Sequence, residues 1–316
     1  MSRLLLGLDI GGTKTAAVLG RSPVEVLGRE EFPTAGPQLT LQRALAAARR
    51  LLAGFPGEAL AAAGVACGGP LDAAAGVILS PPNLPGWRDV PVVELLAREL
   101  GVSARLENDA NAGALAEHRY GAGRGTRDFV FVTFGTGLGA GLILGGRLHR
   151  GAHGLAGEIG HVRLAPGGPL AYGKRGSAEA FASGAGLTQA ARRSVEEARR
   201  CGSLLADAQP EGLTARAVGR AAAEGDQLAC DLVRECGRSL GRILAILVDV
   251  VNPECIAVGG LALRLGDLIL EPARQELAAE ALPQAAAGCR VVPAALGEAV
   301  GDAQALVVAE LALGGE

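Results

Sequence analysis

Apolar residues dominate three consecutive segments at the start of the chain, and short polar or glycine-containing turns separate them. Apolar runs of this length predict strands, and tight turns between them predict antiparallel neighbours. We therefore expect an antiparallel meander over residues 3–10, 15–20 and 24–32. Helical spacing of alanine and leucine follows at residues 40–55 and ends at a glycine, which is typical of a helix end.

The rest of the chain alternates between short apolar runs and longer segments with helical spacing. We expect strands at 60–69, 103–109, 254–263 and 289–296, and helices at 90–101, 110–123 and 302–313, with a helical region from Gly184 to Val251. Residues 129–144 repeat the layout of residues 4–20, in which a strand, a glycine-threonine turn and a second strand follow one another. The repeat predicts two domains, and the lack of a Ser- or Pro-rich linker predicts short crossings between them.

Composition narrows the class of protein. The 316 residues are 49% hydrophobic, which is enough for a large core and about two domains of ordinary size. The net charge of −3 provides no basic field for a nucleic acid, so we expect no nucleic-acid partner. No signal peptide or bilayer-spanning run is recognisable, so we expect no membrane association and a cytoplasmic location. The six cysteines form no CxxC pair and are expected to be reduced thiols.

Both glycine-threonine turns have the composition of an anion-binding loop. Glycines let backbone N–H groups approach a ligand closely, and "GGTK" at residues 11–14 lies between two strands. A strand follows the turn, so the turn is neither a Walker loop nor a dinucleotide fingerprint, which both continue into a helix. One such turn is by itself only a tight hairpin, but the second copy at Thr136 and Gly137 favours a polyphosphate held by both. Asp9 ends the first strand, where a carboxylate beside phosphates predicts a Mg²⁺ ion, bound directly or through water.

A cluster of polar residues marks the junction between the strand at 103–109 and the helix after it. Glu107, Asn108, Asp109 and Asn111 are too many polar residues for a helix N-cap alone, although Asp109 has the composition of a cap. Together these residues favour a catalytic role over capping, with Asp109 as the candidate proton acceptor.

Six motifs occur in the order and spacing of the ROK sugar kinases, and the chain resembles this family over about residues 4–311. They are "DIGGTK", "PNLPGW", "ENDANAGALAE", "FGTGLGAG", "GEIGH" and "NPECIAVGG". The resemblance is strongest to the ATP-dependent glucokinases of bacteria. It implies an α/β fold with two ribonuclease H-like (actin-like ATPase) domains flanking a cleft. It places a small domain at 1–108 plus 299–316 and a large domain at 109–298, because the last helix returns to the first domain.

The resemblance also implies a function and residue roles. It implies transfer of phosphate from ATP to the 6-hydroxyl of D-glucose, with Asp109 as general base and Mg²⁺ at Asp9. The implied sugar-binding residues are Gly69, Asn83, Asn108, Asp109, Glu158, His161 and Glu179. The implied nucleotide-binding residues are Asp9, Gly11, Gly12, Thr13, Lys14, Thr136, Gly137, Gly259 and Gly260. A homodimer or homotetramer is expected from the family, and Trp87 is expected to be a packing residue.

One segment departs from the family pattern. Where the family often has three cysteines that bind a structural zinc together with the histidine, this chain has Leu170, Tyr172 and Ser177. Leucine offers no ligand, so we predict that zinc is absent. We expect packing of Leu170 and Tyr172, with hydrogen bonds from the glycine-rich turn, to hold the segment instead. The sequence does not indicate which group orients His161.

Two alternatives stay open. One is a ROK kinase for fructose, mannose, N-acetylmannosamine or N-acetylglucosamine, since loop details decide which hydroxyls are paired. The other is a sugar-sensing transcriptional regulator, whose helix-turn-helix domain would precede the kinase-like part. Because Asp9 comes so early and Asp109 is present, we expect a kinase.

Overall fold

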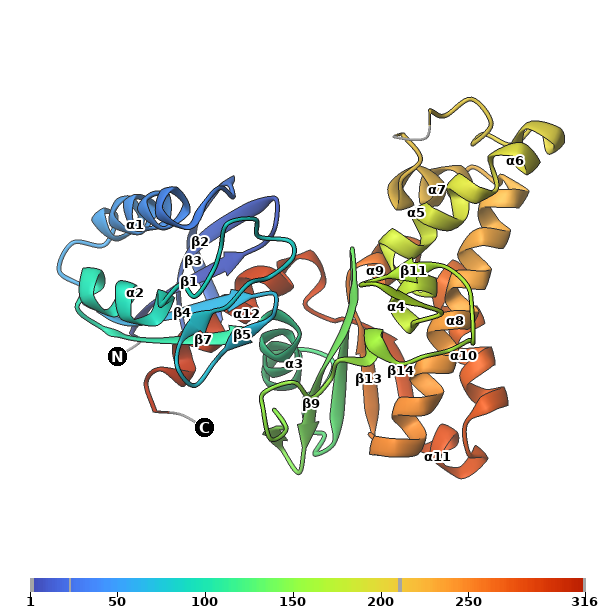
Figure 1. Cartoon of the computed structure of the whole chain (residues 1–316). Helices are drawn as coiled ribbons and strands as arrows, with labels where there is room; N and C mark the ends of the chain where they lie inside the picture. The colour runs from blue at the N-terminus through green and yellow to red at the C-terminus, as the bar shows by residue number, and fades with distance from the viewer. Residues whose placement is uncertain (1–2, 23, 210–211, 315–316) are drawn as a thin grey trace. The chain divides into compact units, whose positions relative to one another are not determined.

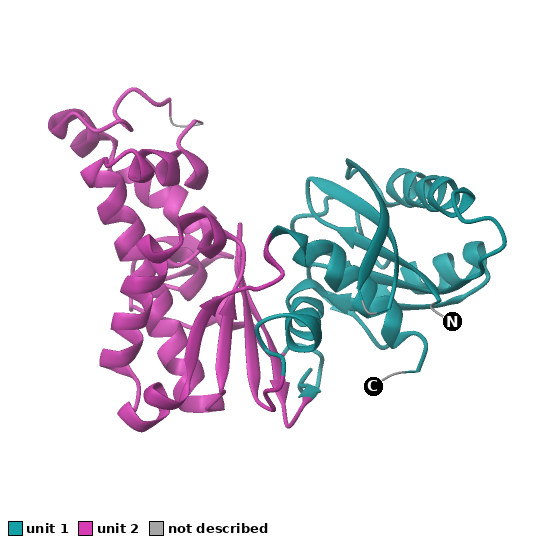
Figure 2. Ribbon diagram, turned by 180° about the vertical axis from the view of Figure 1, so that it is seen from behind, with its two compact units in different colours: residues 1–124, 147–155, 298–316 teal, residues 125–146, 156–297 magenta. Residues whose placement is uncertain are grey.

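The chain folds into two compact units in a computed structural model that describes residues 3–22, 24–209 and 212–314. Unit 1 comprises residues 1–124, 147–155 and 298–316, and unit 2 comprises residues 125–146 and 156–297 (Figure 2). The chain therefore passes between the units at four places, and each unit is described below by itself.

Unit 1 is built on a mixed sheet with strand order β3-β2-β1-β4-β7 (Figure 1). The strands are β1 (Leu4–Ile10), β2 (Lys14–Arg21), β3 (Glu25–Pro33), β4 (Leu60–Cys67) and β7 (Ser103–Asn108), with a small hairpin of β5 (Leu71–Asp72) and β6 (Val77–Ile78). β1, β2 and β3 pair antiparallel, which confirms the predicted meander, and β4 and β7 add in parallel. The parallel strands bring their carboxyl ends to one edge of the sheet, where Cys67 is paired with Asn108.

Helices cover both faces of this sheet. α1 (Pro37–Ala53) and α2 (Val92–Leu100) pack on one face, since Ala44, Ala47 and Leu96 share a buried cluster with side chains of β1 and β4. α12 (Val300–Leu311) packs on the other face, and α3 (Asp109–Tyr120) lies beside it. Tyr120 Oη donates to the Glu310 carboxylate at 2.8 Å, which ties the end of α3 to α12.

Two paired glycines let α12 approach the sheet closely. Gly7 of β1 and Gly64 of β4 are register partners. A Cβ at Gly64 would lie 2.2 Å from the backbone N of Ala309, and one at Gly7 would lie 2.7 Å from the Cβ of Ala305. Since real Cβ contacts are not this short, the helix can occupy its position only because both residues lack a side chain.

The second sheet has strand order β10-β9-β8-β13-β14, and all of its strands except β10 belong to unit 2. The strands are β8 (Phe129–Phe134), β9 (Leu138–Leu144), β10 (Arg147–Leu148), β13 (Cys255–Val258) and β14 (Arg290–Pro293), with a hairpin of β11 (Leu170–Ala171) and β12 (Lys174–Arg175). The helices of unit 2 are η1 (Ile159–His161), α4 (Ala178–Phe181), α5 (Gly184–Arg193), α6 (Val195–Cys201), α7 (Ala215–Ala223), α8 (Gln227–Val251), α9 (Leu261–Leu265), α10 (Asp267–Glu280) and α11 (Pro283–Gly288). The short helix η2 (Gly297–Ala299) begins at the last residue of unit 2 and continues into unit 1. β8 and β9 pair antiparallel, as β1 and β2 do, which confirms the repeated layout.

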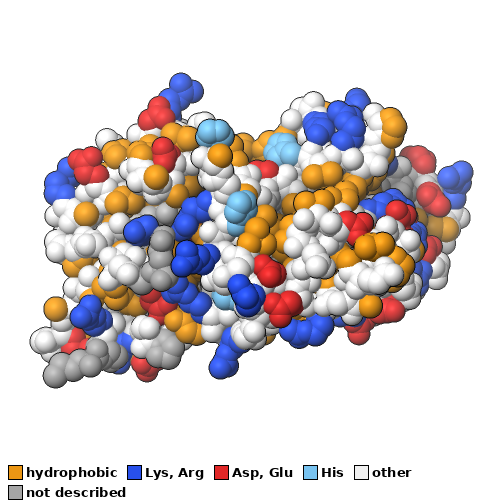
Figure 3. Space-filling model, turned by 90° about the horizontal axis from the view of Figure 1, so that it is seen from below, with side chains coloured by type: hydrophobic (Ala, Val, Ile, Leu, Met, Phe, Trp, Pro, Cys, Tyr) orange, Lys and Arg blue, Asp and Glu red, His pale blue; other side chains and the backbone are white. Residues whose placement is uncertain are grey.

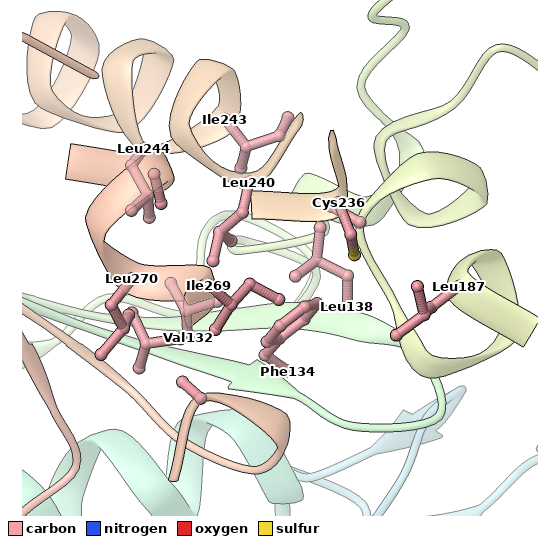
Figure 4. Packing of buried hydrophobic residues seen from close by; sticks show 14 of the residues in the cluster. Val132, Phe134, Leu138, Leu187, Cys236, Leu240, Ile243, Leu244, Ile269 and Leu270 are labelled. Carbon is pink, nitrogen blue, oxygen red and sulfur yellow. The ribbon is translucent and has the colours of Figure 1, made fainter. Parts of the chain in front are cut away.

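The core of unit 2 lies between its sheet and the long helix α8. Figure 4 shows Leu240 and Leu244 of α8, Ile269 of α10 and Phe134 of β8 converging in this layer. α8 begins at an N-cap, where the Asp226 carboxylate accepts from the Ala229 backbone N–H. The helix ends at Asn252 in the left-handed conformation, which suits asparagine better than most residues.

Most predicted long elements are confirmed, but the 14-residue helix α10 and the short hairpin strands were missed. The expected strand at 254–263 is wrong at its end, because β13 stops at Val258 and α9 begins at Leu261. The helical region 184–251 is interrupted between α6 and α7 and again between α7 and α8. Hairpins of two-residue strands carry too few residues to show a period. Unit 1 includes α3, which packs against α12, and residues 147–155. The domain boundary at Asp109 stays a prediction.

Among the described residues, no helix combines the length and the apolar character needed to cross a bilayer. Basic and acidic side chains are interspersed on the face seen in Figure 3, in agreement with the small net charge.

Candidate active site

Asp9 lies near the carboxyl end of β1, and α12 contacts its carboxylate. Gln304 Nε2 of α12 donates to Asp9 Oδ1 at 3.3 Å, and a Cβ at Gly301 would lie 2.8 Å from Oδ2. Burial, and next the negative charge of Asp109, raise the pKa of Asp9 to about 7. A buried carboxylate beside a second carboxylate favours a cation, so Asp9 suits the Mg²⁺ role.

One hydrogen bond within the first glycine turn and two from Thr34 hold the turn in its conformation. Gly11 N donates to Lys14 O at 3.1 Å, and Thr34 Oγ1 donates to Gly11 O at 2.7 Å. Gly12 and Thr13 are exposed, and the Thr13 carbonyl accepts from the Thr34 backbone N–H at 3.0 Å. A Cβ at Gly12 would lie 2.6 Å from the Asn83 carbonyl oxygen, which places the predicted sugar-loop residue Asn83 against the predicted nucleotide turn.

Lys14 is engaged by a neighbouring strand. Its Nζ lies 3.0 Å from Glu31 Oε2 of β3, in an ion pair whose lysine side chain is 66% exposed. Pairs as exposed as this contribute little to stability, so Lys14 can leave Glu31 at little cost in free energy. Trp87 is buried, and its Nε1 donates to Ala35 O at 2.9 Å, which confirms its expected packing role.

The β7–α3 junction presents Asn108 and Asp109 side by side. Asn108, rather than Asp109, is the N-cap of α3, because its Oδ1 accepts from the backbone N–H of Ala110 and of Asn111. The capping alternative for Asp109 is therefore wrong, and Asp109 is the first residue of the helix. Its Oδ1 accepts from Ala110 N at 2.8 Å.

The turn after β4 lies against both side chains. A Cβ at Gly68 would lie 3.8 Å from Asp109 Oδ2, and a Cβ at Gly69 would lie 3.7 Å from Asn108 Nδ2. Because the cap occupies Asn108 Oδ1, its amide nitrogen is directed to the Gly69 side and can donate to a ligand there. The sequence-predicted residues Gly69, Asn108 and Asp109 thus come together in unit 1, with Asp9 near enough to repel Asp109 electrostatically.

Glu158, His161 and Glu179 also come together, in unit 2. Glu158 precedes the short helix η1, His161 ends it, and Glu179 lies on α4. The pKa of Glu179 lies above its usual value, because burial raises it more than the hydrogen bond from Leu138 and the charge of His161 lower it. Carboxylates and imidazole in such a group provide acceptors for vicinal hydroxyls.

The second glycine turn contacts this group directly. Leu138 N donates to Glu179 Oε2 at 3.0 Å, and a Cβ at Gly137 would lie 2.5 Å from the same oxygen. The carbonyl of Thr136 accepts from Ala185 N at 3.1 Å, at the start of α5. Thr136 and Gly137 are therefore fixed between the acid of α4 and the first turn of α5.

Gly259 and Gly260 follow β13, beside the same turn. Gly259 N donates to Val132 O at 2.9 Å. Gly260 has a φ of 63°, and a Cβ there would lie 2.3 Å from the Phe134 carbonyl oxygen. Glycine is required at position 260 by both backbone conformation and space, so these residues offer bare backbone at the end of a strand neighbouring β8.

Of the three residues expected in place of zinc ligands, Leu170 lies on β11, Tyr172 lies in the turn of the β11–β12 hairpin, and Ser177 precedes α4. Leu170 is 48% exposed, so its expected packing role is wrong, and its backbone instead bonds to the Gln189 side chain. The Tyr172 ring lies 5.5 Å from that of His161, and Lys174 Nζ donates to the His161 carbonyl. Within the described residues, the Oγ of the buried Ser177 has no hydrogen-bond partner. Leucine, tyrosine and serine here do not form the donor set of a zinc site.

Sequence reasoning missed the partners contributed from far along the chain. Gln304 and Gly301 contact Asp9 across almost the whole sequence, and Arg150 bonds to Glu107. These residues lie in segments that were assigned only to a terminal helix or to a connection. In the described part of the chain, no three His, Cys, Asp or Glu side chains are grouped to hold a metal ion.

Comparison with known proteins identifies the family. The model of the ROK family matches residues 5–310. The chain belongs to the ROK family. A glucokinase of Streptomyces coelicolor is 36% identical over 86% of this chain and 86% of its own length. An N-acetylmannosamine kinase of Shigella flexneri is also 36% identical, over 81% of this chain and 82% of its own.

A solved ROK structure agrees with the fold. The ROK family glucokinase from Streptomyces griseus, in complex with glucose and AMPPNP, superposes with a TM-score of 0.81 and 32% identity over 98% of this chain and 99% of that chain. The chain thus has the two-domain, actin-like ATPase fold of ROK sugar kinases, as expected. These relatives support a sugar kinase, a phosphotransferase that acts on a sugar and a nucleotide.

Proposed function

We propose that this ROK protein transfers the γ-phosphoryl group of ATP to the 6-hydroxyl of D-glucose in the cytoplasm. The observation that carries the proposal is the Asp109 carboxylate. Its Oδ1 is held by the Ala110 N–H, and its Oδ2 lies on the side of the Gly68–Gly69 turn. A carboxylate oriented in this way is suited to accept the hydroxyl proton as the oxygen attacks phosphorus.

The other residues of unit 1 prepare the two reactants. Asn108 Nδ2 donates to a sugar hydroxyl beside Gly69, and Asn83 supports this loop. Asp9 would hold Mg²⁺, directly or through water, and the ion would neutralise charge on the phosphates. Gly11, Gly12, Thr13 and Lys14 offer backbone N–H groups, a hydroxyl and a cation to the same phosphates.

Unit 2 supplies the remaining sugar and nucleotide contacts. Glu158, His161 and Glu179 accept hydrogen bonds from the sugar hydroxyls farther from the reacting end. Thr136 and Gly137 bind phosphate, and Gly259 and Gly260 lie under the nucleoside. We propose that zinc has no part in this site and that the active protein is a homodimer or homotetramer, as expected for the family.

Glucose is favoured over N-acetylated sugars by the acceptor group and by the relatives. Glu158, Glu179 and His161 can accept hydrogen bonds from hydroxyls. The glucokinase match spans 86% of this chain, whereas the N-acetylmannosamine kinase match spans 81%. The identity to both relatives is the same, which keeps N-acetylmannosamine as the second candidate.

The test is an ADP-release assay with Mg²⁺-ATP over a panel of hexoses, including fructose, mannose, N-acetylmannosamine and N-acetylglucosamine. The proposal expects the highest kcat/KM on glucose. Turnover confined to N-acetylated sugars would transfer the assignment to the second candidate, and no turnover on any sugar would refute kinase activity.

A further inference from the structure

Glu107 is a buried carboxylate in the strand that delivers the proposed base. Its side chain is 3% exposed, and both of its oxygens are occupied. Oε1 accepts from the Asn108 backbone N–H at 3.0 Å and from Asn111 Nδ2 at 3.0 Å, and Oε2 accepts from Arg150 Nε at 2.8 Å. No step of the proposed reaction uses this carboxylate, although burying a charge is costly unless it is paired.

The two acceptor bonds of Oε1 bracket the proposed base along the chain. Asn108 immediately precedes Asp109, and Asn111 follows it by two positions. One oxygen atom therefore fixes both the peptide that leads into Asp109 and a side chain in the first turn of α3. These bonds join the end of β7 to the start of α3, on either side of Asp109.

The positive charge of Arg150 offsets the cost of burying the Glu107 carboxylate. Arg150 lies in residues 147–155, the excursion of the chain that groups with unit 1 between two stretches of unit 2. The chain returns to unit 2 at Ala156, shortly before Glu158. The Arg150–Glu107 pair thus fixes residues 147–155 to the β7–α3 junction. This segment leads to Glu158, a proposed sugar-binding residue.

We propose that Glu107 and Arg150 are a positioning pair, which orients Asn108 and Asp109 for phosphoryl transfer without touching the substrate. The inference rests on the proposed function, because it assigns a task to residues that support Asp109. A displaced base costs turnover even when the substrate still binds, since the rate of transfer depends steeply on alignment. The pair should therefore affect kcat far more than the KM of either substrate.

The variants separate orientation from charge. Arg150→Ala removes the guanidinium, and Arg150→Lys keeps the charge without the planar Nε donor. Glu107→Gln keeps an acceptor for the Asn108 N–H but loses the ion pair. Arg147→Ala, an exposed arginine in the same excursion, is the matched control.

We expect kcat for glucose to fall about tenfold to a hundredfold in Arg150→Ala and in Glu107→Gln, with each KM changed by less than about threefold. Arg150→Lys should retain an intermediate kcat, and Arg147→Ala should match the wild type. The losses in the Glu107→Gln and Arg150→Ala double variant should be much less than multiplicative, because both changes break the same pair. Added methylguanidinium should restore part of the kcat of Arg150→Ala, and a purely structural residue would show no such rescue.

Each outcome decides the inference. Wild-type kcat in Arg150→Ala, a loss confined to KM, or multiplicative losses in the double variant would overturn it while leaving the proposed function intact. If Arg150→Ala does not fold, the same criteria apply to Arg150→Lys and Glu107→Gln. A wild-type protein that phosphorylates no sugar would refute the proposed function, and the inference with it.

Discussion

The backbone N–H of Leu138 donates to Glu179 Oε2 at 3.0 Å. This hydrogen bond joins the turn proposed to bind phosphate to an acid proposed to bind sugar. The same oxygen lies 2.5 Å from the position that a Cβ on Gly137 would occupy. In unit 2, therefore, the two proposed binding functions share one contact, and a change in either residue must disturb both.

Gly137→Ala is expected to impair binding of both substrates. The new methyl group would collide with the Glu179 carboxylate and break its hydrogen bond to Leu138. We expect the kcat/KM for glucose and for ATP each to fall by about tenfold or more, the scale of a lost positioning contact. Gly288→Ala, which adds a methyl group in open space in the same unit, is the control for steady-state kinetics. A normal kcat/KM for either substrate in Gly137→Ala would contradict the shared contact.

Gly64→Ala is expected to test the fold of unit 1. Its Cβ would lie 2.2 Å from Ala309 N, so α12 would have to move off the sheet. We expect a loss of about 3 kcal/mol or more in the free energy of unfolding, measured by urea denaturation. Gly36→Ala, at the N-cap of α1, has no atom within 4 Å of its new methyl group and should lower the stability far less. Equal midpoints for the two variants would show that α12 does not need this close approach.

The long elements and most of the candidate site were predictable from the sequence because they depend on local pattern. Apolar runs predicted β1 and β8, and the glycine turns after them predicted exposed backbone. The partners Gln304 and Arg150 were not predictable, because a side chain that meets Asp9 or Glu107 from a distant segment leaves no local signal. The N-cap was assigned to Asp109 as an alternative, whereas the structure uses Asn108, since both residue types cap helices well.

The pKa of Asp9 predicts a pH-dependent stability in the absence of Mg²⁺. Burial and Asp109 raise this pKa from 3.8 to about 7, so the native state keeps a proton that the unfolded state has lost. Between about pH 4 and 7, Asp9 should therefore make the protein less stable as pH rises, by up to about 1.4 kcal/mol per pH unit. Urea denaturation across this range should show a steeper decline for wild type than for Asp9→Asn, and Mg²⁺-ATP should offset the decline. Parallel pH profiles for the two proteins would contradict the assignment.

The β11–β12 segment predicts that activity does not depend on zinc. The resemblance places Leu170, Tyr172 and Ser177 where zinc-binding cysteines are expected, and the ring of Tyr172 contacts that of His161. We expect metal analysis of the purified protein to find no stoichiometric zinc, and activity to return fully when only Mg²⁺ is added after chelation. Zinc bound in a one-to-one ratio and lost together with activity would contradict this expectation.

The central claim is that Asp109 accepts the proton of the sugar hydroxyl, and the most direct measurement is the turnover of Asp109→Asn. The variant keeps the size of the side chain and should keep glucose affinity, measured by titration calorimetry, because Asn108 and the residues of unit 2 are unchanged. We predict a fall in kcat of about a hundredfold or more, whereas Asp89→Asn, at an exposed position of the same unit, should retain wild-type turnover. A kcat for Asp109→Asn close to that of the wild type would contradict the account.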